Sequence, residues 1–466
     1  MRLRLQIERS GQFYKSVLAI ALPVALLNIF NFSVGMVDSV MLGQLGETAM
    51  AASSLGNQVF AIVNSVTYGT TGAAATLLSQ YWGKRDLAAI PKVIAACMRY
   101  TFLICLAASV VVFLQPVAIM RIFSSDMAVI AAGAGYLRIY SLSYALYAIS
   151  ITLITSLRAI ENVRVPMLIN MLSYSLNIGF NYCLIFGKFG LPALGITGAA
   201  IGTLCARIIE LLALIIYCKF FEKTVHITLG SFFCFDRGIE HRFFRLLVPI
   251  TITEVLFGVG STMYPLVFGR LDTGAMAAYS VSYALQQLCT SLTFALCSAA
   301  CVLIGKAVGE GDRQKVMTQS KAFHLMCWAV GFLSGAFLYF GKNWLLGLYA
   351  ITPETMAVTD NFLTLSALTL PLVAMEGMYA AGTLRGGGDA TFNMIFTNLC
   401  LWGIGIPLVF IAGFVLHWPM WAVFLLTKSY YLIKALCCLV RFYSGKWIKD
   451  VTADGKFLKK TATEPS

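Results

Sequence analysis

The chain has few charged residues: Asp, Glu, Lys and Arg together make up only 12% of its 466 residues. A soluble protein carries roughly 25% of these residues, because its water-facing surface needs them. Hydrophobic residues reach 59%, and the mean hydropathy is +0.80. This composition excludes a soluble protein of this size and indicates a chain whose surroundings are lipid.

Motifs for enzymatic chemistry are also missing. The sequence has no Walker-type phosphate loop, so we expect no ATP hydrolysis in this chain. Its four histidines form no metal-ligand or Ser-His-Asp pattern, and its 13 cysteines are scattered without a CxxC pair. Such cysteines favour helix packing over zinc or redox chemistry. We expect no enzymatic activity, no cofactor and no metal beyond a coupling ion.

Long apolar runs, in contrast, are abundant. A helix needs about 20 apolar residues to cross ~30 Å of hydrocarbon. The sequence predicts an all-α polytopic membrane protein with twelve transmembrane helices. They are placed at 17–42, 49–79, 93–116, 128–157, 165–187, 194–218, 246–269, 275–304, 322–341, 354–384, 392–414 and 418–440.

The positions of the basic residues predict the orientation. With the N-terminus inside, the inside segments hold 25 of the 34 Lys and Arg, and the outside loops hold four. Cytoplasmic loops are enriched in Lys and Arg, so both termini are expected in the cytoplasm. This distribution explains the net charge of +13 without nucleic acid as a partner. The basic segment 1–16 leads into an apolar run too long for a signal peptide, so we expect it to be retained.

A repeat divides the chain into two halves. Residues 43–52 read GQLGETAMAA and residues 269–278 read GRLDTGAMAA, with six of ten positions identical at an offset of 226. Six spans per half is an even number, which predicts a parallel repeat of two six-helix lobes. The predicted domains are an N-terminal lobe at 1–220, a cytoplasmic linker at 221–245, a C-terminal lobe at 246–442 and a cytoplasmic tail at 443–466. Two similar bundles suit alternating access.

Polar residues within the first half suggest an ion site. Asp38 shares one helical face with Asn28 and Asn31, and Asn177 and Asn181 lie one turn apart on a later span. Ionisable groups in lipid are costly and are therefore functional candidates. A carboxylate with amide oxygens can bind a small hard cation or hold a proton. Alternatively, the carboxylate is solvated at the helix end and the amides only join helices.

The second half carries two intramembrane glutamates. Glu254 is related to Asn28 by the repeat offset, and Glu376 shares a face with Tyr379. Each glutamate is predicted to contact the substrate or the coupling ion, or else to pair with a base such as Lys434. These residues, with Asn28 and Tyr379, are the predicted substrate cavity.

Several motifs, in order, resemble the multidrug and toxic compound extrusion (MATE) family over about residues 10 to 450. They are Pro23, Val37-Asp38-Ser39 before Gly43, NIGFNYCLIFG at 177–187, LPALGITGAAIGT at 191–203, Glu254 15 residues before Gly269, LRGGGD at 384–389 and RFYSGKW at 441–447.

The resemblance implies two six-helix lobes around a central cavity, with drugs expelled against an inward flow of Na⁺ or H⁺. It implies a coupling-cation site made by Asp38, Asn177, Asn181 and Thr203, and it matches Glu254 to an acid of the C-lobe cavity. The chain departs from the family at Asn181, where many members have aspartate. It also has Ala374 where the family has a second C-lobe acid, so Glu376 is the nearest replacement.

The predicted function is secondary active efflux of organic, cationic or zwitterionic compounds by antiport with Na⁺ or H⁺. The second asparagine of the site tilts the coupling ion towards Na⁺. The predicted partners are small organic molecules and the lipid bilayer, and the protein is expected as a monomer in the cell membrane. The alternative is a lipid or lipid-linked oligosaccharide flippase, which would need several Arg or Lys in its cavity.

Overall fold

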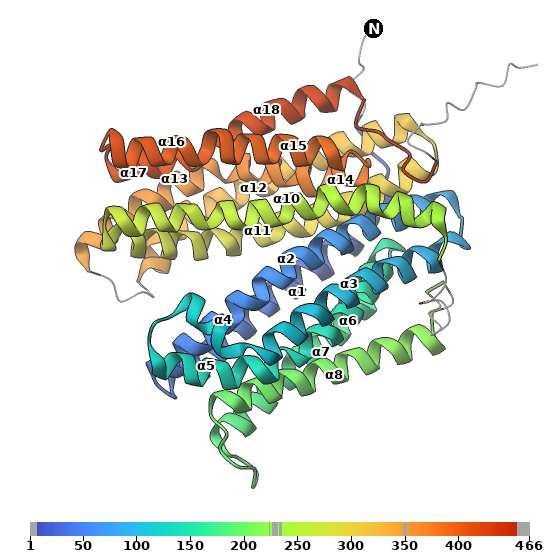
Figure 1. Ribbon diagram of the computed structural model, residues 1–466. Coiled ribbons are helices and arrows are strands. Elements are labelled where there is room, and N and C mark those ends of the chain that lie inside the picture. Colours follow the sequence, from blue (N-terminus) through green and yellow to red (C-terminus); the bar gives the residue numbers. More distant parts are fainter. Residues whose placement is uncertain (1–6, 223, 226–231, 233–234, 348–351, 454–466) are drawn as a thin grey trace, which may run out of the picture. The chain divides into compact units, whose positions relative to one another are not determined.

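The computed structural model describes residues 7–222, 224–225, 232, 235–347 and 352–453, and the regular structure in these ranges is helical (Figure 1). The first part holds α1 (Gly11–Gly43), α2 (Glu47–Lys84), α3 (Ala89–Leu114), α4 (Pro116–Phe123), α5 (Met127–Tyr140), α6 (Leu142–Ala159), α7 (Arg164–Phe186) and α8 (Ile196–Phe220). The second part holds α10 (Arg237–Leu271), α11 (Thr273–Gly309), α12 (Arg313–Leu346), α13 (Pro353–Gly377), η1 (Met378–Thr383), α14 (Leu384–Gly386), α15 (Ala390–Cys400), η2 (Leu401–Gly405), α16 (Ile406–Phe410), η3 (Ile411–Val415), α17 (Met420–Leu426) and α18 (Ser429–Ser444), where η marks a π-helix.

Ten helical segments in the described ranges are long and apolar enough to cross a membrane. They correspond to ten of the twelve predicted spans. The other two, 49–79 and 165–187, correspond to α2 and α7, which are long enough to cross but more polar. The prediction of twelve spans thus rests on these two helices, whose polar residues include Asn177 and Asn181 of the predicted ion site.

The chain divides into two compact units. Unit 1 comprises Met1–Ala25, Ser79–Arg85 and Val248–Ser466, and unit 2 comprises Leu26–Leu78 and Asp86–Leu247. α1 and α2 therefore contribute residues to both units, whereas the predicted lobe of 1–220 contains both helices entirely. The lobe boundaries drawn from the sequence stay a prediction.

Within unit 2, α7 packs along α8, and α3, α5 and α6 complete the bundle. Close approach of α7 and α8 depends on Gly198 and Gly202. A Cβ at Gly198 would lie 2.5 Å from the Leu184 carbonyl oxygen, so any side chain there would push the helices apart. This contact sets the position of the asparagines on α7.

Within unit 1, α11, α12 and α13 pack on one another, and α18 packs on α13 and α15. The later spans, at the red end of the colour scale in Figure 1, are interrupted. The π-helices η2 and η3 break the span from Ala390, and a turn at Thr427 and Lys428 separates α17 from α18. π-helices often occur at functional sites, and η1 and η2 border the cavity described below.

The two halves of the sequence repeat form equivalent hydrogen bonds at the start of a helix. Asp86 accepts a hydrogen bond from the Ala89 backbone N–H, and Asp312 accepts one from the Lys315 backbone N–H. Both pairs are separated by the repeat offset of 226. Each aspartate accepts from a free N–H in the first turn of the next helix, and Asp312 is also the N-cap of α12.

The ends of α2 and α11 cross each other within unit 1. A Cβ at Gly83 would lie 2.0 Å from the Lys306 carbonyl oxygen, and a Cβ at Gly309 would lie 2.0 Å from the Gln80 carbonyl oxygen. Because the offset of 226 relates Gly83 to Gly309 and Gln80 to Lys306, the two contacts are reciprocal. The two backbones can approach this closely only because both positions are glycine.

Candidate functional site

The four residues predicted to bind the coupling cation lie together in unit 2. The Asn181 side-chain amide donates to Asp38 Oδ1 at 2.9 Å and to Asn177 Oδ1 at 3.4 Å, and the Asn177 amide donates to Thr203 Oγ1 at 3.2 Å. Thr203 in turn donates to the Ala199 backbone carbonyl at 3.0 Å. A single chain of hydrogen bonds therefore joins α1, α7 and α8 through these side chains.

The packing of α7 against α8 presents the two asparagines. Asn177 and Asn181 are one helical turn apart, so both point to the same side. Both are buried, whereas Asp38 and Thr203 are half-buried. Gly202 leaves the space that the Asn181 amide occupies, since a Cβ there would lie 2.2 Å from Asn181 Oδ1.

The network offers oxygen atoms suited to a monovalent cation. Asp38 supplies one negative charge and has no ion-pair partner among the described residues. Asn181 Oδ1 is buried without a hydrogen-bond partner, although buried acceptors are usually satisfied. Carboxylate, amide and hydroxyl oxygens are ligands that hard cations prefer, so the donor set fits Na⁺.

Binding of a proton would need fewer donor atoms than binding of Na⁺. A single carboxylate in a partly buried position can hold a proton, and Asp38 meets that condition alone. The described residues contain no group of three or more His, Cys, Asp or Glu that could hold a metal ion. Na⁺ and H⁺ are both compatible with the side chains of this network.

Arg207 and Glu210, three residues apart on α8, form an ion pair. Arg207 Nη1 lies 2.7 Å from Glu210 Oε2, and the Arg207 guanidinium lies 5.1 Å from the centre of the Tyr147 ring. Ser173 donates a further hydrogen bond to Glu210 at 3.3 Å. The pair is thus internally neutral.

Unit 1 contains a cavity of about 220 Å³ that both predicted glutamates line. Each glutamate faces a basic residue from another element. Glu254 on α10 receives a hydrogen bond of 2.5 Å from Arg385 Nη2, and Glu376 on α13 is ion-paired with Lys434 on α18. Lys434 was the alternative partner expected for Glu376. The negative charges of this cavity are therefore balanced.

A third base of the cavity has a neutral partner. Lys428, in the turn before α18, is buried and donates to Gln286 Oε1 at 2.8 Å. Its ammonium nitrogen also lies 5.0 Å from the centre of the Phe424 ring. No carboxylate of the described residues pairs with it. With the glutamates paired, one positive charge is left in the cavity.

Tyr379 and Asn28, the other two predicted cavity residues, lie elsewhere. Tyr379 is buried on η1, where its ring packs against His324 and Phe442, and it is not among the residues that line the 220 Å³ cavity. Asn28 is half-buried on α1 in unit 2. Tyr379 is a core residue because η1 turns its side chain towards α12 and α18 instead of the cavity.

Sequence reasoning missed Arg385 and Lys428. Arg385 lies 131 residues after its partner Glu254, and no local sequence pattern links them. Lys428 is not among the predicted site residues. A lysine inside the predicted span 418–440 is itself a signal, because an ionisable group in lipid is a functional candidate.

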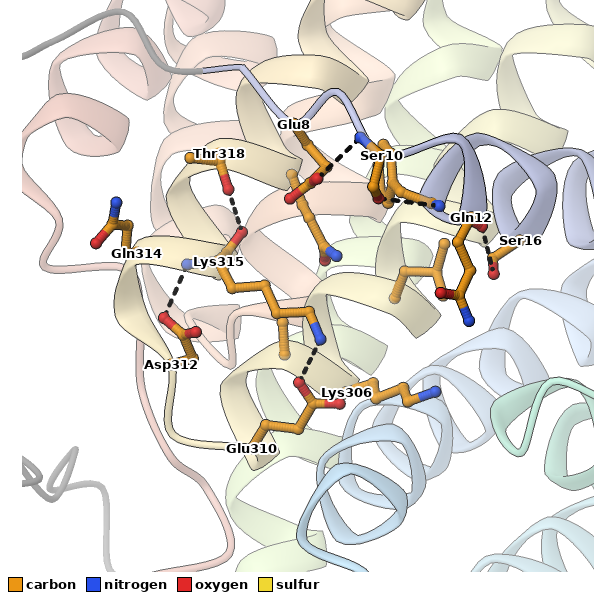
Figure 2. Close-up of a pocket in the computed structure, with 14 residues that line it drawn as sticks. Glu8, Ser10, Gln12, Ser16, Lys306, Glu310, Asp312, Gln314, Lys315 and Thr318 are labelled. Atoms are coloured by element: carbon orange, nitrogen blue, oxygen red, sulfur yellow. Dashed lines mark hydrogen bonds and ion pairs between the residues drawn. The ribbon is translucent and has the colours of Figure 1, made fainter.

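A separate polar pocket of about 580 Å³ in unit 1 lies between residues 8–16 and the start of α12 (Figure 2). Figure 2 shows Lys315 reaching Glu310, with 2.6 Å between Nζ and Oε2, while Asp312 accepts a hydrogen bond from the Lys315 backbone. These charged groups bind one another, and none of the predicted site residues lines the pocket. We therefore do not consider this pocket a candidate for the ion site or the substrate site.

Comparison with known proteins places these features in a family. The model of the MatE family matches residues 23–183 and 249–411, which is more than half of the chain. The second match begins where residue 23 falls when it is shifted by the repeat offset of 226. The two matched segments therefore correspond to the two halves that share the sequence repeat.

Individual relatives are similar over nearly their whole length. The probable multidrug resistance protein NorM of Thermotoga maritima is 22% identical over 445 residues, covering 95% of this chain and 95% of that protein. NorM of Rhizobium meliloti is 27% identical over 413 residues, covering 84% and 85%.

A solved structure shows the same fold. The outward-facing conformation of a multidrug resistance MATE family transporter of the MOP superfamily matches with a TM-score of 0.82 at 16% identity, covering 95% of this chain and 99% of that one. With the family match over both halves, these findings establish that the chain belongs to the MatE family of transporters and is a multi-pass protein of the cell membrane rather than an enzyme.

Proposed function

We propose that the protein exports organic compounds by antiport, and that its coupling ion binds at Asp38, Asn177, Asn181 and Thr203. The observation that carries this proposal is the hydrogen-bonded chain of these four side chains with an unsatisfied oxygen at Asn181. An ion drives a transport cycle only if it binds the two conformations with different affinity. The half-buried carboxylate of Asp38 on α1 is linked through the asparagines of α7 to Thr203 on α8. It meets this need, because a movement of these helices would change the surroundings of the carboxylate.

The proposed coupling ion is Na⁺, with H⁺ as the competing ion. One carboxylate with three neutral oxygen donors neutralises a monovalent cation and supplies several hard ligands. An aspartate in place of Asn181 would instead have favoured a proton relay. The proposed substrates are drug-like organic molecules that are cationic or zwitterionic.

The proposed topology has twelve transmembrane helices in two parallel six-helix lobes, with both termini in the cytoplasm. The two matches of one family model and the equivalent hydrogen bonds accepted by Asp86 and Asp312 support a repeat of this kind. The protein is proposed to be a monomer in the lipid bilayer. No nucleic-acid partner is proposed, because the excess of Lys and Arg in the cytoplasmic segments accounts for the net charge.

The flippase alternative draws on the basic residues of the unit 1 cavity. Arg385, Lys428 and Lys434 all line it, as a pyrophosphate site would require. Two of the three are neutralised by glutamates, however, so one positive charge is left for a ligand with several negative charges. Drug export is therefore the better supported function.

The test is efflux from proteoliposomes loaded with a panel of fluorescent organic dyes. A Na⁺ gradient and a pH gradient are imposed separately on the same preparation, and protein-free liposomes give the background. Gradient-driven efflux of at least one dye is the expected result. Failure to move any dye, together with binding of a lipid-linked pyrophosphate, would favour the flippase instead.

A further inference from the structure

The buried lysine of the unit 1 cavity has unused binding capacity. An ammonium group has three N–H donors, and the described contacts of Lys428 supply one acceptor, the neutral Gln286 Oε1. Only 9% of Lys428 is exposed, so water does not surround the charge. Burial of an ionisable group without a counter-ion is costly within a membrane protein and marks a site for a charged partner.

The local backbone adds to this positive potential. Lys428 precedes the first residue of α18, a helix of 16 residues, and the N-terminal end of a helix carries a partial positive charge. The two carboxylates that line the same cavity, Glu254 and Glu376, are ion-paired with Arg385 and Lys434 instead. A bound ligand would supply the missing negative charge.

The walls of the cavity suit an aromatic acid. Several tyrosines surround the polar groups, among them Tyr279, Tyr283, Tyr430 and Tyr431, and aromatic side chains bind flat apolar rings by stacking. The volume of about 220 Å³ is smaller than the roughly 300–1,000 Å³ of a site that holds a whole drug-sized molecule. The cavity therefore fits one part of a substrate, such as a ring that carries a carboxylate.

We propose that the unit 1 cavity binds the carboxylate of an organic substrate, with the Lys428 ammonium as its counter-ion. The inference rests on the proposed export of organic compounds and narrows its substrates to carboxylate-bearing molecules, zwitterions included. Pure cations gain nothing from this cavity, because both of its glutamates are already neutralised.

The experiment compares two dyes that differ only at the carboxylate. Rhodamine B carries a cationic ring system and a carboxylate, and its ethyl ester keeps the ring system but lacks the negative charge. Binding of each dye to the detergent-solubilised full-length protein is measured by fluorescence polarisation, without any ion gradient. The wild-type protein should bind rhodamine B more tightly than the ester.

Substitutions of Lys428 assign the difference to this residue. Lys428→Met should weaken rhodamine B binding about tenfold or more, as expected for the loss of a charged hydrogen bond, and should leave ester binding unchanged. Lys428→Arg should keep most of the affinity for rhodamine B. Lys188→Met, at an exposed loop position outside the cavity, removes the same charge and should change neither dye.

Three results would overturn the inference: equal binding of both dyes to the wild-type protein, no binding of rhodamine B at all, or equal weakening of both dyes by Lys428→Met. The comparison of the dyes on wild-type protein needs no variant, so it stands even if Lys428→Met does not fold. Because no gradient is used, the result is independent of transport. Lys428-dependent binding without any gradient-driven efflux would refute the proposed antiport and leave this inference intact.

Discussion

At the scale of single residues, the proposed ion site depends on the space beside Asn181. Gly202→Ala would place a Cβ only 2.2 Å from Asn181 Oδ1, which is too close for both atoms. The Asn181 amide would have to rotate away from Asp38. We expect Gly202→Ala to reduce ion-dependent efflux at least fivefold. The free energy of unfolding should fall by about 1–3 kcal/mol, the usual cost of overpacking.

The matched control for this change is Gly179→Ala on α7, because a Cβ at Gly179 meets nothing within 4 Å. Efflux and thermal unfolding are measured on both variants in the same liposome preparation. If the two variants transport equally well, the position of the Asn181 amide is not needed for coupling.

Asn177 is the second residue that tests the site. Asn177→Ala removes one neutral oxygen donor and the hydrogen bond to Thr203, but it leaves the charge of Asp38 in place. If Na⁺ is the coupling ion, the Na⁺ concentration for half-maximal efflux should rise about three- to tenfold. This corresponds to a loss of about 1 kcal/mol in the free energy of Na⁺ binding. An unchanged Na⁺ dependence would exclude Asn177 as a ligand.

At the scale of helices, the crossing of α2 and α11 leaves no room for a side chain at Gly83 or Gly309. Gly83→Ala or Gly309→Ala would bring a Cβ to 2.0 Å from a backbone oxygen of the opposite helix, which only a shift of the helix ends can relieve. We expect each substitution to lower the thermal midpoint, with a loss of about 1–3 kcal/mol.

The control for the crossing is Gly135→Ala on α5, where a Cβ meets nothing within 4 Å. Alanine has the higher helix propensity, so this variant should be at least as stable as the wild-type protein. Thermal unfolding in one detergent, followed by tryptophan fluorescence, compares all three variants. A crossing variant as stable as Gly135→Ala would show that the helix ends are not in close contact.

The elements also show what could be predicted from the sequence. Asp38, the asparagines of α7 and the apolar spans follow from helical periodicity, which is local. The family resemblance added Thr203 and joined the four residues into one site. The π-helices η1 and η2 have no comparable local signal, and the packing of Tyr379 on η1 against His324 and Phe442 could not be predicted from the sequence. The pair of Glu254 and Arg385 joins residues 131 positions apart, so only the folded chain reveals that this glutamate is neutralised.

At the scale of the whole molecule, the excess of basic residues predicts which loops face the cytoplasm. Phe189, in the loop between α7 and α8, is 89% exposed, and Arg85, after α2, is also exposed. A cysteine at Phe189 should react with an impermeant thiol reagent added outside intact cells, whereas a cysteine at Arg85 should react only after the cells are opened. The unmodified chain gives the background from its own cysteines. The opposite pattern would reverse the predicted orientation.

The central claim concerns the charge of Asp38 as the link between ion flow and drug export. Asp38→Asn keeps the shape of the side chain and an oxygen that can accept from Asn181, but it removes the charge. The most direct measurement is dye efflux from proteoliposomes with wild-type and Asp38→Asn protein, each under a Na⁺ gradient and a pH gradient in turn. We predict that the wild-type protein exports dye under the Na⁺ gradient and that Asp38→Asn, present in equal amount and equally folded, does not do so under either gradient. Full gradient-driven efflux by Asp38→Asn would contradict the account.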